Sequence, residues 1–213
     1  MLSRWICSVA LVLAGAGCSD PGEGKPAAQV SPSAASNDAV PASSGGRVWT
    51  LSPEPSRIGF QASKVTRTHT GGFKAWRGEI RMPEDGPIED GRVQVEIDMA
   101  SVDTDASMLT DHLMTGDFFL VEEHPTATFT STGIKPDASG QDLFSVTGDL
   151  TLRGVTKSVT FPATIKRTGE TLQVEAEFTL NRQDFGIAYP GMPDDLIRDN
   201  VVVQLDLRAD GGA

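Results

Sequence analysis

The stretch that decides the fold is residues 144–165, FSVTGDLTLRGVTKSVTFPATI, in which apolar and polar side chains alternate. Every second residue from Phe144 to Leu152 is apolar or glycine, and the same holds from Val159 to Ile165. This alternation predicts two strands, each with one face exposed to solvent and one face buried. A turn is expected between them at residues 154–157. The pair would then present one continuous apolar surface, which something must cover.

The same alternation recurs along the chain between segments that favour turns. With the hairpin it predicts about eight strands, whose separations suit antiparallel pairing. A single sheet covers its apolar face and removes its edges by closing, so we expect an all-β fold, an eight-stranded antiparallel barrel. A two-sheet sandwich is the alternative. The predicted strands outside the hairpin are Arg57–Thr66, Phe73–Met82, Val93–Met99, Thr126–Ile134, Leu172–Leu180 and Val201–Leu207.

One short helix is predicted between Asp105 and Thr115. Leu109, His112 and Leu113 fall at positions i, i+3 and i+4, which places them on one face of a helix. We expect this amphipathic helix to pack beside or over the mouth of the barrel.

Residues 1–18 resemble a bacterial lipoprotein signal. Arg4 precedes an apolar stretch of about thirteen residues, too short for a bilayer core that needs about twenty. Three small residues lead into Cys18, the position at which such signals are cut and acylated, although Gly15 stands where leucine is usual. Ordinary signal-peptidase cleavage therefore stays open. An acylated Cys18 would be the lipid anchor of a protein on the periplasmic side of the cell envelope, on the inner or the outer membrane.

Residues 19–47 consist mostly of Pro, Ala, Ser and Gly without periodicity, which predicts a disordered linker. Residues 48–210 remain, enough for one domain with a substantial core.

Composition excludes several classes of function. The net charge of −11 argues against nucleic acid as a partner, because phosphate binding needs clustered Lys and Arg. Beyond Cys7 and Cys18 the chain has no cysteine, so the domain can form neither a disulfide nor a cysteine metal site. The three histidines show no His-x-x-x-His pair, and no metal site is predicted.

The sequence does not predict an enzyme. Asp111 and His112 are neighbours on the expected helix and point about 100° apart, so they do not form a base with its orienting carboxylate. There is no nucleophile elbow, and a hydrolase would need a convergent Ser, His and acid set that the spacing does not offer. No cofactor is expected.

Six motifs follow one another along the domain: WTLSP at 49–53 with IGF at 58–60, DHL at 111–113, DFF at 117–119, HPTATF at 124–129, GDLTLRGVTK at 148–157 and NRQDFGI at 181–187. Together they look like the YceI family, and the resemblance runs the length of the domain. It implies a lipocalin-like, extended antiparallel barrel that holds a long isoprenoid or other lipid in its lumen. Eight strands agree with this, since they leave room for side chains or one slim ligand.

We therefore expect the protein to bind, sequester or transport an apolar lipid outside the cytoplasm. Many family members have a histidine where this chain has Lys64, so Lys64 and nearby His69 are candidate headgroup contacts, together with Asn181 and Arg182. The alternative is a membrane-tethered stress or interaction module with a side-chain-filled barrel and an unknown protein partner. The candidate lumen residues are Phe60, Phe129, Phe144, Leu150, Phe161 and Phe178.

Overall fold

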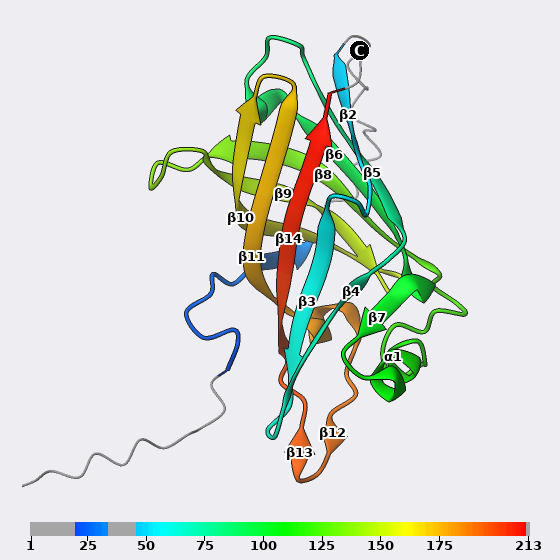
Figure 1. The fold of residues 1–213 in the computed structure, drawn as a ribbon. Helices are drawn as coiled ribbons and strands as arrows, with labels where there is room; N and C mark the ends of the chain where they lie inside the picture. The colour runs from blue at the N-terminus through cyan, green and yellow to red at the C-terminus, as the bar shows by residue number, and fades with distance from the viewer. Residues whose placement is uncertain (1–19, 34–45, 212–213) are drawn as a thin grey trace, which may run out of the picture.

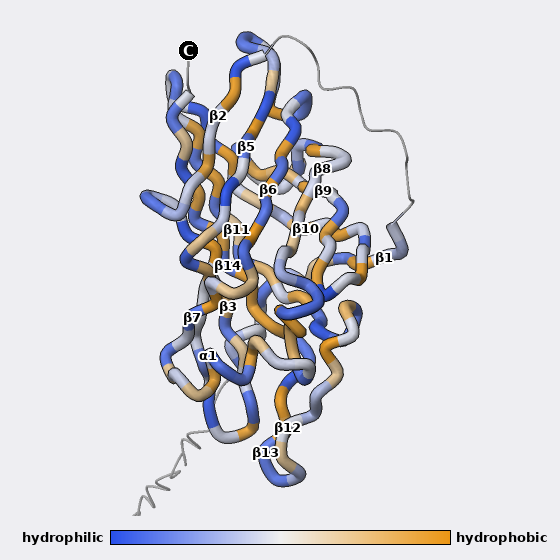
Figure 2. Tube along the Cα trace, turned by 90° about the vertical axis from the view of Figure 1, so that its right-hand side faces the viewer, coloured by the Kyte–Doolittle hydropathy of each residue, from blue (hydrophilic) through white to orange (hydrophobic). Residues whose placement is uncertain are grey.

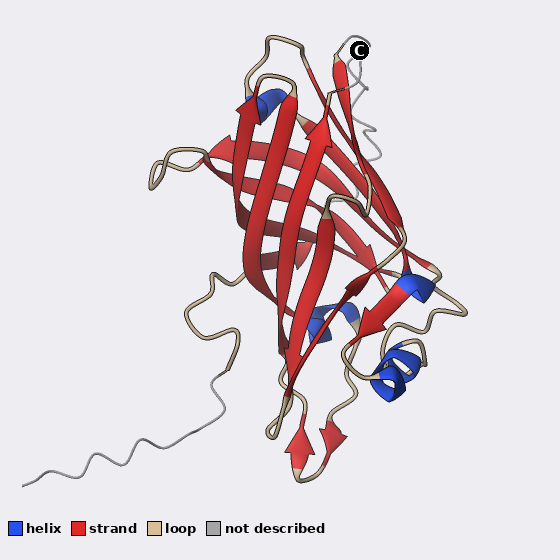
Figure 3. Ribbon diagram, in the orientation of Figure 1, coloured by secondary structure: helices blue, strands red, loops and turns tan. Residues whose placement is uncertain are grey.

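The structure is a computed structural model that describes residues 20–33 and 46–211. Antiparallel strands dominate it. The described residues contain a single α-helix, α1 (Ser107–Leu113), which lies at one end of the barrel (Figures 1 and 3). The strands are β1 (Gln29–Pro32), β2 (Arg47–Leu51), β3 (Arg57–Ser63), β4 (Thr68–Phe73), β5 (Trp76–Met82), β6 (Arg92–Asp98), β7 (Val102–Thr104), β8 (Thr126–Pro136), β9 (Leu143–Leu152), β10 (Val155–Thr168), β11 (Thr171–Asn181), β12 (Gly191–Met192), β13 (Asp195–Leu196) and β14 (Asn200–Asp210). Short 3-10 helices lie at Ile88–Asp90, Met99–Ser101 and Arg182–Phe185.

One strongly curled sheet contains all strands except β12 and β13, which pair with each other. Its order is β2-β5-β6-β8-β9-β10-β11-β14-β3-β4-β7, with β1 beside β10. The chain passes from β2 through a turn into β3, from β4 into β5, and from β6 through a 3-10 helix into β7. Trp49 of β2 also pairs with Gly211 just after β14, so the end of this order returns toward its beginning. The prediction of an all-β antiparallel barrel with one short helix is confirmed.

The predicted strands occupy eight positions around the barrel. At three of these positions a bend divides the strand into two, which gives the pairs β2 and β3, β4 and β5, and β6 and β7. The sequence pattern predicted β3, β5 and β6 but missed β2, β4 and β7, the short continuations beyond each bend. These continuations carry only three to six residues, too few for alternation to stand out.

The predicted hairpin forms as β9 and β10, but its turn lies elsewhere than expected. Phe144 lies opposite Ala163, and Leu152 lies opposite Val155. The turn is therefore Arg153 and Gly154, not residues 154–157. Both have positive φ, 50° and 73°, the signature of the two-residue turn that matches the twist of a hairpin.

The prediction of a disordered linker is wrong for residues 20–33. β1 lies where β10 and β11 diverge: it pairs with Lys157–Thr160 of β10, and Ala28 N donates to Thr179 O of β11 at 2.8 Å. Lys25 also forms an ion pair with Glu177. Backbone pairing and ion pairs hold this segment although its composition gives no apolar periodicity. Residues 34–45 and the predicted signal with Cys18 lie outside the described residues.

Apolar side chains point inward all around the barrel and form three clusters. The alternation of apolar and polar residues is visible along the strands in Figure 2. At one end Trp49 is fully buried, and its Nε1 donates to Glu170 O at 2.7 Å. None of the helices in the described ranges is long and apolar enough to cross a membrane.

Candidate functional site: an apolar lumen with a polar mouth

The interior of the barrel holds a cavity lined by apolar side chains and one glycine. Its volume is about 160 Å³. Ile, Val, Leu, Met and Phe side chains from β3, β5, β6, β8, β9, β10, β11 and β14 surround it. A buried space without polar partners does not hold ordered water, so it suits only an apolar occupant.

A second cavity of about 190 Å³ continues the first toward α1. The two share lining residues, among them Leu150, Leu180 and Val203, so they form one lumen that narrows at these side chains. Phe185 and Phe118 belong to the second cavity and bring in the loops beyond β11 and α1. The lumen is therefore elongated along the barrel.

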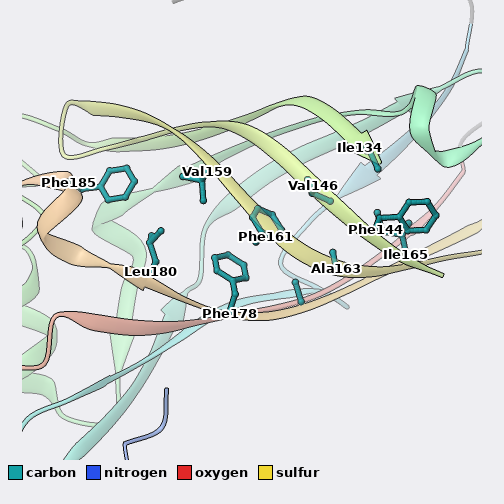
Figure 4. Packing of buried hydrophobic residues seen from close by; sticks show 11 residues of the cluster. Ile134, Phe144, Val146, Val159, Phe161, Ala163, Ile165, Phe178, Leu180 and Phe185 are labelled. Carbon is teal, nitrogen blue, oxygen red and sulfur yellow. The ribbon is translucent and has the colours of Figure 1, made fainter. Parts of the chain in front are cut away.

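Aromatic rings from three strands meet beside this lumen. Phe161 of β10 and Phe178 of β11 stack with centroids 4.4 Å apart and planes at 14°, and Phe129 of β8 lies 5.8 Å from Phe161 (Figure 4 shows the stacked pair). Phe60 lines the second cavity, at 6.0 Å from Phe73. These rings give the lumen a flat, stiff wall against which an unsaturated chain can pack.

A third cavity, about 240 Å³, forms the mouth of the lumen. It shares Phe60, Leu113 and Ile197 with the second cavity, so the three spaces follow one another. Unlike the other two it has several polar side chains in its wall: Ser63, Lys64, His69, His112, Tyr189 and Asp195. Polar side chains thus join apolar ones in the wall at this end, which we call the mouth end: the β3–β4 turn, α1 and the β12–β13 hairpin.

The charged groups of the mouth are paired with one another. Lys64 forms an ion pair with Asp195, and this hydrogen bond lowers the pKa of the Asp195 carboxyl. His69 Nδ1 lies 2.8 Å from Asp105 Oδ1, and the bond from the His69 ring lowers the pKa of Asp105. Each of these two basic side chains therefore has an acidic partner at the mouth.

An aromatic group forms one wall of the mouth. The His112 ring lies 5.0 Å from Phe118 and 5.2 Å from Tyr189, both edge-on. His112 Nε2 is 2.8 Å from Asp117 Oδ2, which fixes the ring. Leu109, His112 and Leu113, the predicted face of the helix, line the mouth as expected, whereas sequence reasoning missed Tyr189 and Asp195. The one available signal for Tyr189 was that it is the only tyrosine of the chain.

The candidate lumen residues divide into two groups. Phe129, Leu150, Phe161 and Phe178 line the deep cavity, and Phe60 lines the second. Phe144 belongs to the packed core, 8% exposed, and lines none of the three cavities.

The candidate headgroup residues also divide. Lys64 and His69 lie in the mouth. Arg182 is 6% exposed, and its guanidinium donates to the carbonyls of Ile187, Ile197 and Arg198 and to Asp199. Asn181 accepts a bond from Gln183 N at the start of a 3-10 helix. Arg182 and Asn181 thus hold the loop between β11 and β14. Arg182 also lines the second cavity, whereas Lys64 lines the third. No group of three or more potential metal ligands occurs in the part of the chain that is described.

The comparison with known proteins agrees with this geometry. The family model described as "YceI-like domain" matches residues 49–209, from β2 to the end of β14. The chain belongs to the YceI-like domain family. Among relatives of this YceI-like domain, Protein YceI of Escherichia coli is 41% identical over 127 residues, 55% of this chain and 62% of the E. coli protein. The match therefore spans less than two thirds of that relative's length.

Two solved structures resemble the YceI-like domain. BcnA of Burkholderia cenocepacia has a TM-score of 0.67 at 25% identity, covering 75% of this chain and 99% of BcnA. A polyisoprenoid binding domain from Saccharophagus degradans has a TM-score of 0.61 at 20% identity, covering 77% of this chain and 98% of that domain. The second likeness shows the shared fold.

Proposed function

We propose that this domain binds a long apolar lipid, of the isoprenoid class, with its chain in the lumen and its polar head at the mouth. The observation that carries the proposal is the series of three adjoining cavities, which are lined by apolar side chains and acquire several polar side chains in the wall only at one end. The name of the Saccharophagus degradans domain supports the same ligand class.

Binding in this proposal is burial and involves no bond making. Apolar area taken from water contributes about 25 cal/mol per Å², but a lipid that leaves a bilayer gains little of this. Selection over the membrane then depends on the fit to the stacked Phe161 and Phe178 rings and on polar contacts at the mouth. The protein would sequester or carry its ligand in the bacterial cell envelope, on the periplasmic side, held to a membrane by acylated Cys18.

The test is native purification from the host, organic extraction and mass spectrometry. Leu150, which lines both deep cavities, is replaced by Trp to block the lumen at its narrow point. The matched control is Thr151→Trp, one residue along the same strand, where the Thr151 hydroxyl bonds to Thr156 at an exposed site. We expect a stoichiometric polyprenyl lipid in the parent and the control and its loss from Leu150→Trp, with thermal melts showing that all three fold.

A parent protein that is repeatedly empty and takes up no added isoprenoid would overturn the proposal. That result would favour the alternative of an envelope interaction module whose barrel is filled by its own side chains. If Leu150→Trp does not fold, Val203→Phe at the same narrow point replaces it.

A further inference from the structure

Four large apolar side chains are exposed in the described ranges, and all belong to segments of the mouth end. Val65 is 59% exposed, Met108 85%, Met192 61% and Leu196 49%. Single exposed apolar residues are ordinary on a protein surface. Four that gather at one end, beside an apolar lumen, mark an interaction surface.

The structure ties these residues to the rim of the mouth. Val65 N donates to Leu196 O at 3.2 Å, which joins the β3–β4 turn to the β12–β13 hairpin. Met192 lines the mouth cavity itself. Met108 lies on α1, whose next residue, Leu109, lines the same cavity. The turn, the hairpin and the helix lie at the same end of the barrel in Figure 1. We call these four residues the apolar rim.

The N-terminal segment reaches the same end. Asp20 Oδ2 lies 3.0 Å from Arg198 Nη1, and Arg198 is two residues from Leu196 of the rim. Cys18 precedes Asp20 by two residues, so the chain between their Cα atoms spans at most about 7 Å. Because β1 is paired with β10, the fold fixes this point on the barrel. An acyl chain on Cys18 would therefore enter a membrane close to the rim.

We propose that the apolar rim docks on a zwitterionic lipid bilayer, so that the mouth opens toward the lipid from which the ligand comes. The proposal rests on the proposed lipid-binding function and names the surface that serves it. The charges of this end favour neutral headgroups over anionic ones. Lys64 is paired with Asp195 and Arg198 with Asp20. The other exposed charged residues of these segments include Arg67, Asp194 and Asp111 of α1, so no excess of basic groups attracts anionic lipid.

The test measures binding to phosphatidylcholine vesicles by flotation. The protein is the chain from Ser19 onward, which contains every described residue, so neither the apolar leader nor an acyl group contributes. The rim variant is Val65→Asp with Leu196→Asp. The matched control adds the same two charges at the far end of β8 and β9, as Ser139→Asp with Gln141→Asp, where both side chains are exposed.

We expect the parent and the control to bind equally and the rim variant to bind at least about tenfold more weakly, as for the loss of two inserted apolar side chains. A parent that does not bind, or a rim variant that binds like the parent, would overturn the docking surface. If thermal melting shows the double variant unfolded, Met108→Asp on the exposed face of α1 replaces it, with the same expectation.

Lipid extraction from the same proteins separates this proposal from the one it rests on. A rim variant that holds lipid but acquires it slowly from vesicles supports both proposals. If the parent binds vesicles but its lumen is empty, the lipid-binding proposal is refuted and the docking surface stands.

Discussion

The ring of Phe129 on β8 lies directly over Gly148 on β9. A Cβ at position 148 would stand 2.4 Å from Phe129 Cζ and 2.6 Å from the carbonyl oxygen of Thr130. Gly148 is a member of the apolar face that decides the fold, and its missing side chain makes the space in which the Phe129 ring reaches the lumen.

Gly148→Ala should destabilise the domain because the ring and the backbone of β8 must both move. Overpacking of this kind costs about 1–3 kcal/mol. Urea unfolding would measure the loss. Gly133→Ala is the control, since a Cβ there meets nothing within 4 Å. Equal effects at the two positions would contradict this account.

Arg182→Ala should be among the most damaging substitutions outside the apolar core. It removes a buried guanidinium and leaves the carbonyls of Ile187, Ile197 and Arg198 without their donor. A hydrogen bond to a charged group contributes about 1.5–3 kcal/mol. Because such contributions are not additive, we expect the free energy of unfolding to fall by about 2–4 kcal/mol in total. Arg77→Ala, at an exposed ion pair with Glu96, should cost below about 0.5 kcal/mol. A stability change of that small size in Arg182→Ala would refute the structural role.

Val30→Asp should release β1 from the barrel. Val30 packs against the core cluster, whereas its neighbour Ser31 is exposed. The amide of Thr179, which donates to Pro26 O at 2.9 Å, should then exchange its hydrogen at least about tenfold faster. Ser31→Asp is the matched control and should leave that exchange unchanged. Slow exchange of Thr179 in Val30→Asp would show that β1 holds without this contact.

The free energy of unfolding should fall at acid pH because two carboxylates at the mouth lose their hydrogen-bonded, charged state. The pKa values of Asp105 and Asp195 are lowered in the folded state, chiefly by hydrogen bonds from His69 and Lys64 respectively. Stability from lowered carboxyl pKa values is present above the unfolded-state pKa and is lost as pH falls through the folded one. Thermal unfolding between about pH 2 and pH 6 would show a decline at the acid end. Lys64→Met should flatten that decline, and an unchanged slope would argue against the Asp195 contribution.

The sequence was sufficient for the parts of the fold that rest on alternation. The segment from Phe144 to Ile165 predicts its own hairpin because the polarity of each residue indicates which face of the strand it occupies. The same is true of β8, β11 and β14. The spacing of Leu109 and Leu113 likewise predicted α1. Arg153 was placed on a strand because a polar residue fits the wet face, and only its backbone conformation shows that it begins the turn.

The mouth could not be predicted in the same way. Lys64, His112, Tyr189 and Asp195 come from four separate segments, and nothing local in the sequence brings them together. Arg182 was predicted as a headgroup contact, but its partners are three carbonyls and the Asp199 carboxylate, whose positions depend on the folded loop. β1 was missed because it has only four residues, of which Val30 alone is partly buried, so no alternation shows in the sequence.

The place of β1 also bears on the order in which the molecule forms. Gln29 pairs with Thr160, a residue roughly 130 positions later, and such distant pairings close slowly because the intervening chain must first be ordered. β10 and β11 must already stand apart in their native positions before β1 has a site to occupy. The segment that leaves the ribosome ahead of every other described strand is therefore expected to be the last to settle, and until then β10 and β11 expose unpaired edges to any neighbouring chain.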